Sequence, residues 1–392
     1  MLPHLHCSFT ISSAIGFAFL FAEAERERQV AEETLRGFQD SIGLINPETG
    51  QGTHDMSVSE YITLMQDHVE NDLTDKPRIA SALLTTLGLI ELAFDDFDRA
   101  LFLLTQALIL REDGSPAARG EAHHNLGRVA VDRGDYQTAL IHYEQARKLR
   151  LEAYGPAHED VAMTLQHLGS TRRRIGDFSE SIHYYDQAEV IWVELFGARS
   201  EQLAGLRNNR AWVDIGQARL AEKAGNEVAA NQFYEMALSK LREASAMVRG
   251  IIPANDYRIG RAERSIAQVL ASLGRHQEAL PRYDEAERIL VSRRGPDSQD
   301  VITVIRMRSA SRLQLGVQLD DTAEELARVA EVREAKGREF SAVESWERAE
   351  RLWGLLEQVQ KSRGDESGVQ YAAERRERAL GAIEELTNPP RG

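Results

Sequence analysis

Residues 126–149, LGRVAVDRGDYQTALIHYEQARKL, decide the fold of this 392-residue chain. The same pattern occurs before them at 87–110, LGLIELAFDDFDRALFLLTQALIL, and after them at 168–191, LGSTRRRIGDFSESIHYYDQAEVI. In each copy a small residue follows the first glycine by 12 positions (139 − 127 in the middle copy), and an alanine follows that residue by 7 (146 − 139). A recurring pattern of this kind predicts structural units that stack along one axis.

Each copy predicts two antiparallel helices joined by a tight turn. Gly134-Asp135 and Gly176-Asp177 mark the turn in the second and third copies, since glycine accepts the left-handed backbone that ends a helix. The recurring Gly and Ala are expected where the two helix backbones come closest, because only a small side chain fits there. The Tyr, Phe or Leu between them, such as Tyr143, is expected to fill the space between one helix pair and the next.

Three further units follow, less regularly. Ala211 and Gly225 belong to a fourth, in which the turn glycine stands 14 residues after the alanine (225 − 211) instead of 7 (134 − 127). Seven residues make about two helical turns, so the helices of this unit are expected to be longer while they keep their inner face. Ala267 and Gly274 mark a fifth unit, and Ala310 marks a sixth.

These residues resemble the tetratricopeptide repeat family. The closer likeness is to the repeats of kinesin light chains, because Gly127, Gly169 and Ala211 are spaced by 42 residues (169 − 127 and 211 − 169). The resemblance implies an all-α fold, a right-handed α-solenoid of helix hairpins, over residues 79–335. Helices over residues 336–387 are then expected to cap the array, ahead of a tail at 388–392.

The N-terminal segment differs from the rest of the chain. Residues 1–22 contain no Asp, Glu, Lys or Arg, and CSFTISSAIGFAFLFA at 7–22 is mostly apolar. Because a membrane-spanning helix needs about 20 apolar residues, we expect an apolar helix that anchors the chain in a membrane. A cleaved signal peptide and a buried or wrongly assigned start are the alternatives. Residues 23–78 are predicted to form a helical linker and the first helices of the folded region.

Two segments of the N-terminal third resemble the region that follows the kinase domain in bacterial serine/threonine protein kinases with periplasmic tetratricopeptide repeats. They are AEAERERQVAEETLRGF at 22–38 and EYITLMQDHVENDLTDKPRIASALLTTLG at 60–88. The resemblance implies a single-pass membrane protein whose repeats form an extracytoplasmic sensor or docking array. It implies no kinase activity, because the sequence contains no kinase domain.

Composition and motifs argue against several classes of function. The formal net charge is −15, from 62 acidic and 47 basic residues, and such an acidic chain repels the phosphates of nucleic acids. Cys7 is the single cysteine, so no disulfide within the chain is possible. The adjacent His123 and His124 would point about 100° apart on a helix, which disfavours a shared metal ion. The sequence shows no glycine-rich phosphate loop and no catalytic triad, and we expect no enzyme activity, metal or cofactor.

A binding surface is the remaining candidate. In tetratricopeptide arrays the first helices of successive units line the concave face, and counting back from the Leu-Gly pairs gives the side chains expected to point into it. Asn125 and Asn209 resemble the asparagines that hold peptide backbones in kinesin light chains, and an amide both donates and accepts hydrogen bonds. The arginines would favour an acidic ligand. The candidates are His124, Asn125, Arg128, Gln166, His167, Ser170, Arg173, Asn208, Asn209, Trp212, Arg261, Arg264, Gln268 and Arg308.

The sequence therefore predicts a non-enzymatic scaffold that binds a peptide or protein partner in the concave groove. Two alternatives remain open. One is a regulatory or sensor fragment of a kinase-type receptor, with catalysis on another polypeptide, and the other is a soluble cytoplasmic assembly factor. At each candidate position an ordinary solvated polar residue is the competing interpretation.

Overall fold

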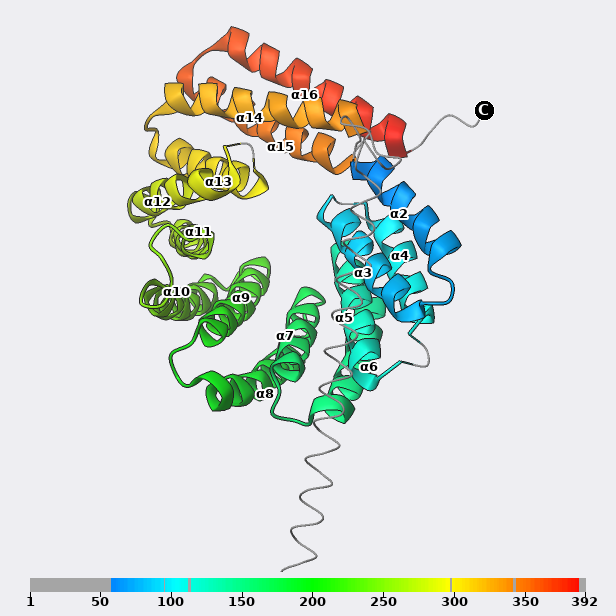
Figure 1. The fold of residues 1–392 in the computed structure, drawn as a ribbon. Helices are drawn as coiled ribbons and strands as arrows, with labels where there is room; N and C mark the ends of the chain where they lie inside the picture. Colours follow the sequence, from blue (N-terminus) through cyan, green and yellow to red (C-terminus); the bar gives the residue numbers. More distant parts are fainter. Residues whose placement is uncertain (1–57, 95, 112–113, 297, 341–342, 388–392) are drawn as a thin grey trace, which may run out of the picture. The chain divides into compact units, whose positions relative to one another are not determined.

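The computed structural model describes residues 58–94, 96–111, 114–296, 298–340 and 343–387. Over these ranges the chain forms fifteen α-helices and no strand, which confirms the predicted all-α fold (Figure 1). The chain divides into two compact units, one ending at Ile175 and the other beginning at Gly176, and each is described by itself.

The first unit is a succession of helices in which neighbours along the chain pack together. Its helices are α2 (Val58–Asp72), α3 (Pro77–Ala93), α4 (Phe97–Ile109), α5 (Pro116–Asp132), α6 (Tyr136–Tyr154) and α7 (Glu159–Arg174). Ile62 and Met65 of α2 pack with Leu83 and Leu87 of α3 and Leu103 of α4, and each is at most 1% exposed. Burial of these apolar side chains holds successive helices together.

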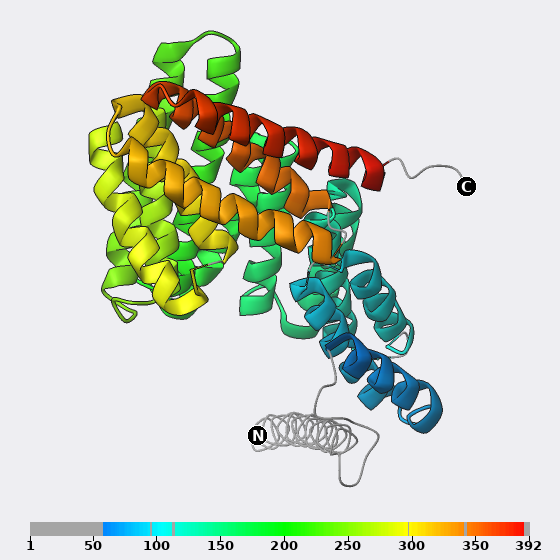
Figure 2. The ribbon, with the colours of Figure 1, turned by 90° about the horizontal axis from the view of Figure 1, so that it is seen from above.

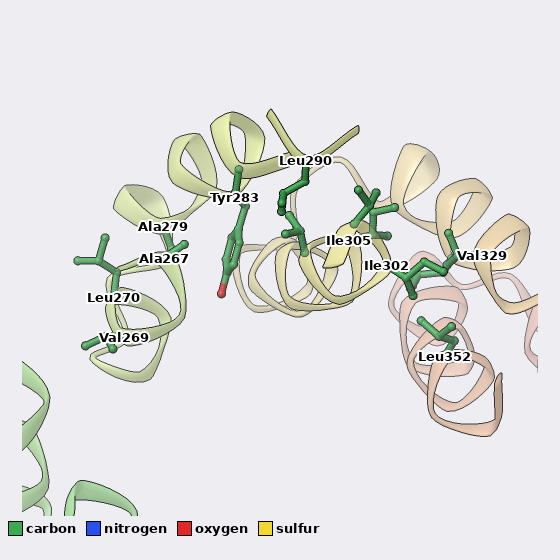
Figure 3. Packing of buried hydrophobic residues seen from close by; sticks show 14 of the residues in the cluster. Ala267, Val269, Leu270, Ala279, Tyr283, Leu290, Ile302, Ile305, Val329 and Leu352 are labelled. Atoms are coloured by element: carbon green, nitrogen blue, oxygen red, sulfur yellow. The ribbon is translucent and has the colours of Figure 1, made fainter. Parts of the chain in front are cut away.

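The second unit continues the same succession of hairpins (Figure 2). Its helices are α8 (Phe178–Phe196), α9 (Glu201–Lys223), α10 (Glu227–Arg249), α11 (Tyr257–Ser272), α12 (His276–Arg294), α13 (Gln299–Leu315), α14 (Leu319–Phe340), α15 (Val343–Arg363) and α16 (Glu366–Thr387). Helices α9 and α10 have 23 residues each, against 16 in α11 and 19 in α12. The prediction of a longer fourth unit is confirmed. One apolar core runs from Ala211 of α9 to Ala372 of α16, and Figure 3 draws part of it, from Ala267 of α11 to Leu352 of α15.

The Gly-Asp pairs end one helix and begin the next, as predicted. Gly134 and Gly176 have φ values of +80° and +85°, in the left-handed region where a Cβ would be strained. The following aspartates cap the second helices. The carboxylate of Asp135 accepts a hydrogen bond from the backbone N–H of Thr138 at 3.1 Å, and that of Asp177 accepts one from Glu180 at 3.3 Å. A two-residue motif therefore sets both the end of one helix and the start of its partner.

The recurring small residues lie at the contacts between helices. Ala139 and Ala146 of α6 have 0% of their area exposed. On α5, a Cβ added to Gly127 would lie 2.7 Å from Cε1 of Tyr143, so the tyrosine ring covers the glycine of its own hairpin. The same ring stacks on His167 of α7, with 5.3 Å between the ring centroids. Tyr143 therefore fills the space toward the next hairpin, which confirms its predicted role.

The sixth unit is shifted by one residue from the predicted register. Ala310, expected at the closest approach of the helices, is exposed, whereas Ser309 is 0% exposed. Ser309 follows Ala267 by 42 residues (309 − 267), which is the period of the earlier units. The prediction for Ala310 is wrong because serine is also small enough for the close contact between the helices. The alanine next to it in the sequence was the more obvious small residue.

The predicted apolar helix at residues 1–22 and the linker up to residue 57 lie outside the described residues. Within the described ranges, none of the helices combines the length and the apolar character that a bilayer-spanning segment requires. The predicted tail at 388–392 likewise lies outside them.

Candidate functional site

The candidate residues lie on the first helix of each hairpin, and their places can be counted from the buried small residue. Three positions before that residue stand His124 on α5, Gln166 on α7, Asn208 on α9, Arg264 on α11 and Arg306 on α13. Their exposure differs strongly along the chain. His124 is only 5% exposed, Gln166, Asn208 and Arg264 are half-buried, and Arg306 is exposed. The same repeat position is therefore interior on α5, half-buried on α7, α9 and α11, and exposed on α13.

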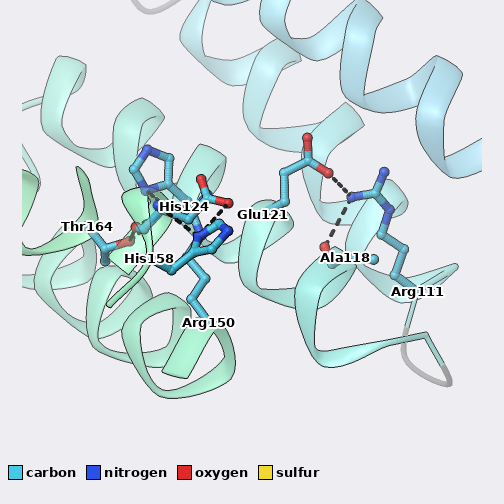
Figure 4. A network of polar contacts seen from close by, with 8 residues as sticks. Arg111, Ala118, Glu121, His124, Arg150, His158 and Thr164 are labelled. Carbon is cyan, nitrogen blue, oxygen red and sulfur yellow. Dashed lines mark hydrogen bonds and ion pairs between the residues drawn. The ribbon is translucent and has the colours of Figure 1, made fainter. Parts of the chain in front are cut away.

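In the first unit, His124 is part of a buried polar network centred on Arg150 (Figure 4). The guanidinium of Arg150 donates to Nδ1 of His124 at 3.2 Å and to Oγ1 of Thr164 at 2.8 Å. It also donates to the backbone carbonyl of Asp160 at 3.0 Å, so one side chain ties α5, α6 and α7 together. His124 and Asn125, at 5% and 6% exposed, are interior residues, which argues against direct contact with a ligand.

Four histidines of the first unit are held neutral by their surroundings. Burial lowers the pKa of His124 to about 2 and that of His167 to about 4, and nearby cationic groups lower both further. Burial also lowers the pKa of His123 to about 4 and lowers that of His142. The Nδ1 atoms of His123 and His142 lie 3.0 Å apart, a distance that requires one ring to donate and the other to accept. All four histidines lie on α5, α6 and α7.

These histidines predict a stability that falls with acidification. Each is neutral in the folded chain and has a pKa below 6.5, so the unfolded chain binds more protons once the pH drops below that value. Stability is therefore full above about pH 6.5 and is lost progressively toward about pH 4. We expect a loss of roughly 2 kcal/mol between about pH 7 and pH 5, after allowance for solvent screening.

The measurement is the thermal midpoint as a function of pH. The double variant His123→Gln/His142→Gln should lose part of the pH dependence, whereas His183→Gln, which changes an exposed histidine on α8, should retain all of it. If the thermal midpoint depends on pH equally in the wild type and both variants, the pH dependence does not arise from His123 and His142.

The remaining candidates of the first unit are accessible to different degrees. Arg128 is exposed, and Gln166, His167, Ser170 and Arg173 are half-buried. Gln166, Ser170 and Arg173 each already take part in a polar or electrostatic interaction. None of these three side chains is therefore without a partner in the protein.

The second unit offers accessible and unoccupied amides. Asn208 and Asn209 on α9 and Gln268 on α11 are half-buried, and no hydrogen bond joins their side chains to any residue that the structure describes. Trp212, one turn after Asn208, is also half-buried and packs partly against the core of the unit. An amide that is accessible and unpaired can donate a hydrogen bond to an extended peptide backbone and accept one from it.

Two of the predicted arginines are held by a carboxylate of the protein. Arg264 and Arg261, both on α11, bind Asp300 at the start of α13, with N–O distances of 2.8 Å and 3.0 Å. Burial would raise the pKa of Asp300, but these two guanidinium groups outweigh it and hold the pKa below its usual value. The pair therefore joins successive first helices, and part of its positive charge is already compensated.

Arg308 is placed differently from the expectation that it faces the groove. It is 6% exposed and donates to Asp284 at 2.9 Å, to Glu325 at 2.6 Å and to Glu287. It lies between α12, α13 and α14 because the register of the sixth unit is shifted. Arg306 stands three positions before Ser309 and is the exposed arginine of α13. The 42-residue spacing from Ala267 to Ser309 is the signal in the sequence that points to it.

These positions define what we call the first-helix face of the second unit. Its members are Asn208, Asn209, Trp212, Arg261, Arg264, Gln268 and Arg306. The face combines amides, one aromatic side chain and three guanidinium groups. Among the residues that the structure describes, no group of three or more His, Cys, Asp or Glu side chains could hold a metal ion.

Comparison with known proteins gives one family match. Residues 119–192, which include α6 and α7, match the model described as tetratricopeptide repeat. A search of curated proteins found no match.

Several solved structures are similar to this chain at low sequence identity. The Rap conjugation gene regulator of the plasmid pLS20, in complex with the Phr* peptide, is 11% identical, covers 92% of this chain and 94% of its own, and has a TM-score of 0.52. BtubC from P. vanneervenii is 19% identical, covers 62% of this chain and 94% of its own, and has a TM-score of 0.45. A Rap protein complexed with competence and sporulation factor is 16% identical over 91% of this chain and 99% of its own, with a TM-score of 0.48.

The matched residues include the Gly127 hairpin and most of the third predicted copy, where the spacing of small residues is most regular. The helices outside the match continue the same alternation of paired helices and tight turns in each unit. Residues 119–192 are therefore tetratricopeptide repeats, and the described helices on either side of them form hairpins of the same kind.

Proposed function

We propose that the chain is a non-enzymatic scaffold that binds a peptide or protein partner on the first-helix face of the second unit. The observation that carries the proposal is the set of unpaired amides. Asn208, Asn209 and Gln268 lie on α9 and α11 with their side chains accessible and without a hydrogen bond to any described residue. A peptide backbone supplies both hydrogen-bond donors and hydrogen-bond acceptors, so it can pair with the N–H and the C=O groups of these amides.

Trp212 adds an apolar contact beside the amides. Interfaces are enriched in tryptophan because its ring buries a large area and its N–H still finds a partner. The pLS20 regulator was solved with a peptide bound, so a chain of this fold is able to hold one.

A peptide array incubated with the full chain tests this proposal. We expect the wild type to retain a subset of random-sequence peptides. The double variant Asn208→Ala/Asn209→Ala should bind them roughly 30-fold more weakly, since two lost hydrogen bonds at about 1 kcal/mol each cost about 2 kcal/mol. The matched control is Asn231→Ala/Gln232→Ala, which removes two exposed amides from the second helix α10. Retention of no peptide by the wild type, or an equal loss in the control, would refute the proposal.

A further inference from the structure

Two histidines of the first unit face each other across one hairpin. His123 lies on α5 and His142 on α6, with their Nδ1 atoms 3.0 Å apart. The ring centroids are separated by 5.3 Å, which is the nitrogen separation plus about one ring radius at each end. The two Nδ1 atoms therefore lie close to the line that joins the ring centres, and each points at the other.

The packing of the hairpin fixes the places of both histidines. Tyr143, the residue after His142, is 0% exposed and covers Gly127, which stands one helical turn after His123. His124, the residue after His123, is 5% exposed and accepts a hydrogen bond in the interior of the unit. The rings of His123 and His142 are themselves half-buried. Solvent therefore reaches a pair of rings whose positions on the two helices are fixed by buried neighbours.

The chemistry of the pair depends on which nitrogens carry hydrogen. At a separation of 3.0 Å, one ring donates the hydrogen on its Nδ1 to the Nδ1 of the other ring. When both rings carry their hydrogen on Nε2 instead, two neutral Nδ1 lone pairs face the same point between the rings. An unprotonated imidazole nitrogen is the most common metal ligand in proteins. The pair therefore offers two nitrogen donors in line.

The side chains that the structure describes supply no third ligand, because none of them forms a group of three or more His, Cys, Asp or Glu that could hold a metal ion. Glu121 of α5 is paired with Arg111, at 2.8 Å. Glu144 of α6 is paired with Arg147, at 2.9 Å. A zinc ion would have only two of its usual three or four protein ligands here, and a calcium or magnesium ion would lack oxygen ligands. The pair suits an ion that is content with two ligands.

Charge favours a monovalent ion over a divalent one. Burial lowers the pKa of His123, and the positive charge of Arg119, one helical turn earlier on α5, lowers it further. The same charge opposes a bound cation, and it opposes a divalent ion about twice as strongly as a monovalent one. Monovalent copper (Cu⁺) carries a single charge, binds imidazole and accepts two ligands in a linear arrangement.

We propose that His123 and His142 bind one Cu⁺ ion between their Nδ1 atoms. Metal–nitrogen bonds of about 2 Å place the two nitrogens of a linear site about 4 Å apart, so the half-buried rings separate by about 1 Å when the ion enters. Each ring then carries its hydrogen on Nε2. Two coordinate bonds replace one hydrogen bond between α5 and α6, so the bound ion stabilises this hairpin. The site lies in the first unit and does not depend on peptide binding by the second.

Calorimetric titration of the full chain with Ag⁺ at pH 7.5 tests the inference, because Ag⁺ shares the charge and the linear coordination of Cu⁺ and is stable in air. Every protein in the test carries Cys7→Ser, since a thiol also binds such ions. We expect the parent to bind one Ag⁺ per chain and to melt at a higher temperature with the ion bound. His123→Gln and His142→Gln should each bind Ag⁺ at least about 10-fold more weakly. The matched control is His183→Gln, which removes an exposed histidine of α8 and should leave Ag⁺ binding unchanged.

Three results would overturn the inference. They are no Ag⁺ binding by the parent, equal binding by the parent and both single variants, and tighter binding of Zn²⁺ than of Ag⁺, which would exclude a linear two-ligand site. If a variant fails to fold, ¹⁵N NMR of the parent decides, because it needs no further substitution. Addition of Ag⁺ should shift the Nδ1 signals of two of the eleven histidines, and a shift at fewer Nδ1 atoms, or at Nε2 atoms instead, would refute the proposed ligands.

Discussion

Replacing Trp353 with alanine is expected to lower the free energy of unfolding by about 4 kcal/mol. Trp353 lies on α15 and is 0% exposed. Its indole N–H donates to Glu334 of α14 at 2.7 Å, and Arg375 of α16 lies 5.2 Å from its ring. Glu334 is itself 0% exposed and binds Arg375 at 2.8 Å. Truncation therefore leaves a cavity between three helices and removes one hydrogen bond from a buried carboxylate.

Hydrogen exchange of α14–α16, together with urea unfolding followed by circular dichroism, measures this effect, because a repeat array can open locally. Trp353→Phe keeps an aromatic ring and much of the volume but removes the N–H and part of the fused ring, so a smaller loss of about 2 kcal/mol in the free energy of unfolding is expected. Trp212→Ala, at a half-buried position on α9, is the second comparison. If Trp353→Ala lowers the free energy of unfolding no more than Trp212→Ala does, the contact between α14, α15 and α16 contributes less to stability than its geometry indicates.

Replacing Gly127 with alanine is expected to destabilise the first unit by about 2–3 kcal/mol. The new Cβ would lie 2.7 Å from Cε1 of Tyr143, whose side chain is 0% exposed. The ring has little room to move, because His124 and His167 lie on it with centroid distances of 5.4 Å and 5.3 Å. The strain must then spread into the helix backbones of α5 and α6.

Gly205 on α9 provides the matched control for this substitution. It is also a glycine within a helix, and a Cβ added there would meet no atom within 4 Å. Gly205→Ala should therefore stabilise the chain by about 0.5–1 kcal/mol, because alanine has the higher helix propensity. The two substitutions are chemically identical, so thermal midpoints that shift in the same direction would refute the close-contact explanation.

The helix pairs, their turns and the lengthened fourth unit could be predicted from the sequence because each depends on spacing within about 25 residues. Gly134 and Asp135, for example, are adjacent in the sequence and together predict the turn. The polar contacts of the site could not be predicted in this way. Arg264 meets Asp300 across 36 residues, and Arg150 meets His124 across 26, so neither partner appears in the local pattern.

The one error of register changed a candidate of the site. Counting from Ala310 instead of Ser309 selected Arg308, which the structure buries, and passed over Arg306, which it exposes. On a helix, a shift of one residue rotates a side chain by about 100°, enough to exchange the interior for the surface. The peptide-binding roles of the remaining candidates stay predictions.

The equal lengths of α9 and α10 have a consequence for how such chains can evolve. Seven residues turn a helix by nearly two full revolutions, with a drift of only about 20°. Helix α9 exceeds α11 by seven residues (23 − 16) and α10 exceeds α12 by four (23 − 19), which is about two turns and about one turn. Growth by whole turns keeps the inner face of each helix toward its partner and adds surface at the end of the hairpin, whereas an insertion of one or two residues in a single helix would turn that face away.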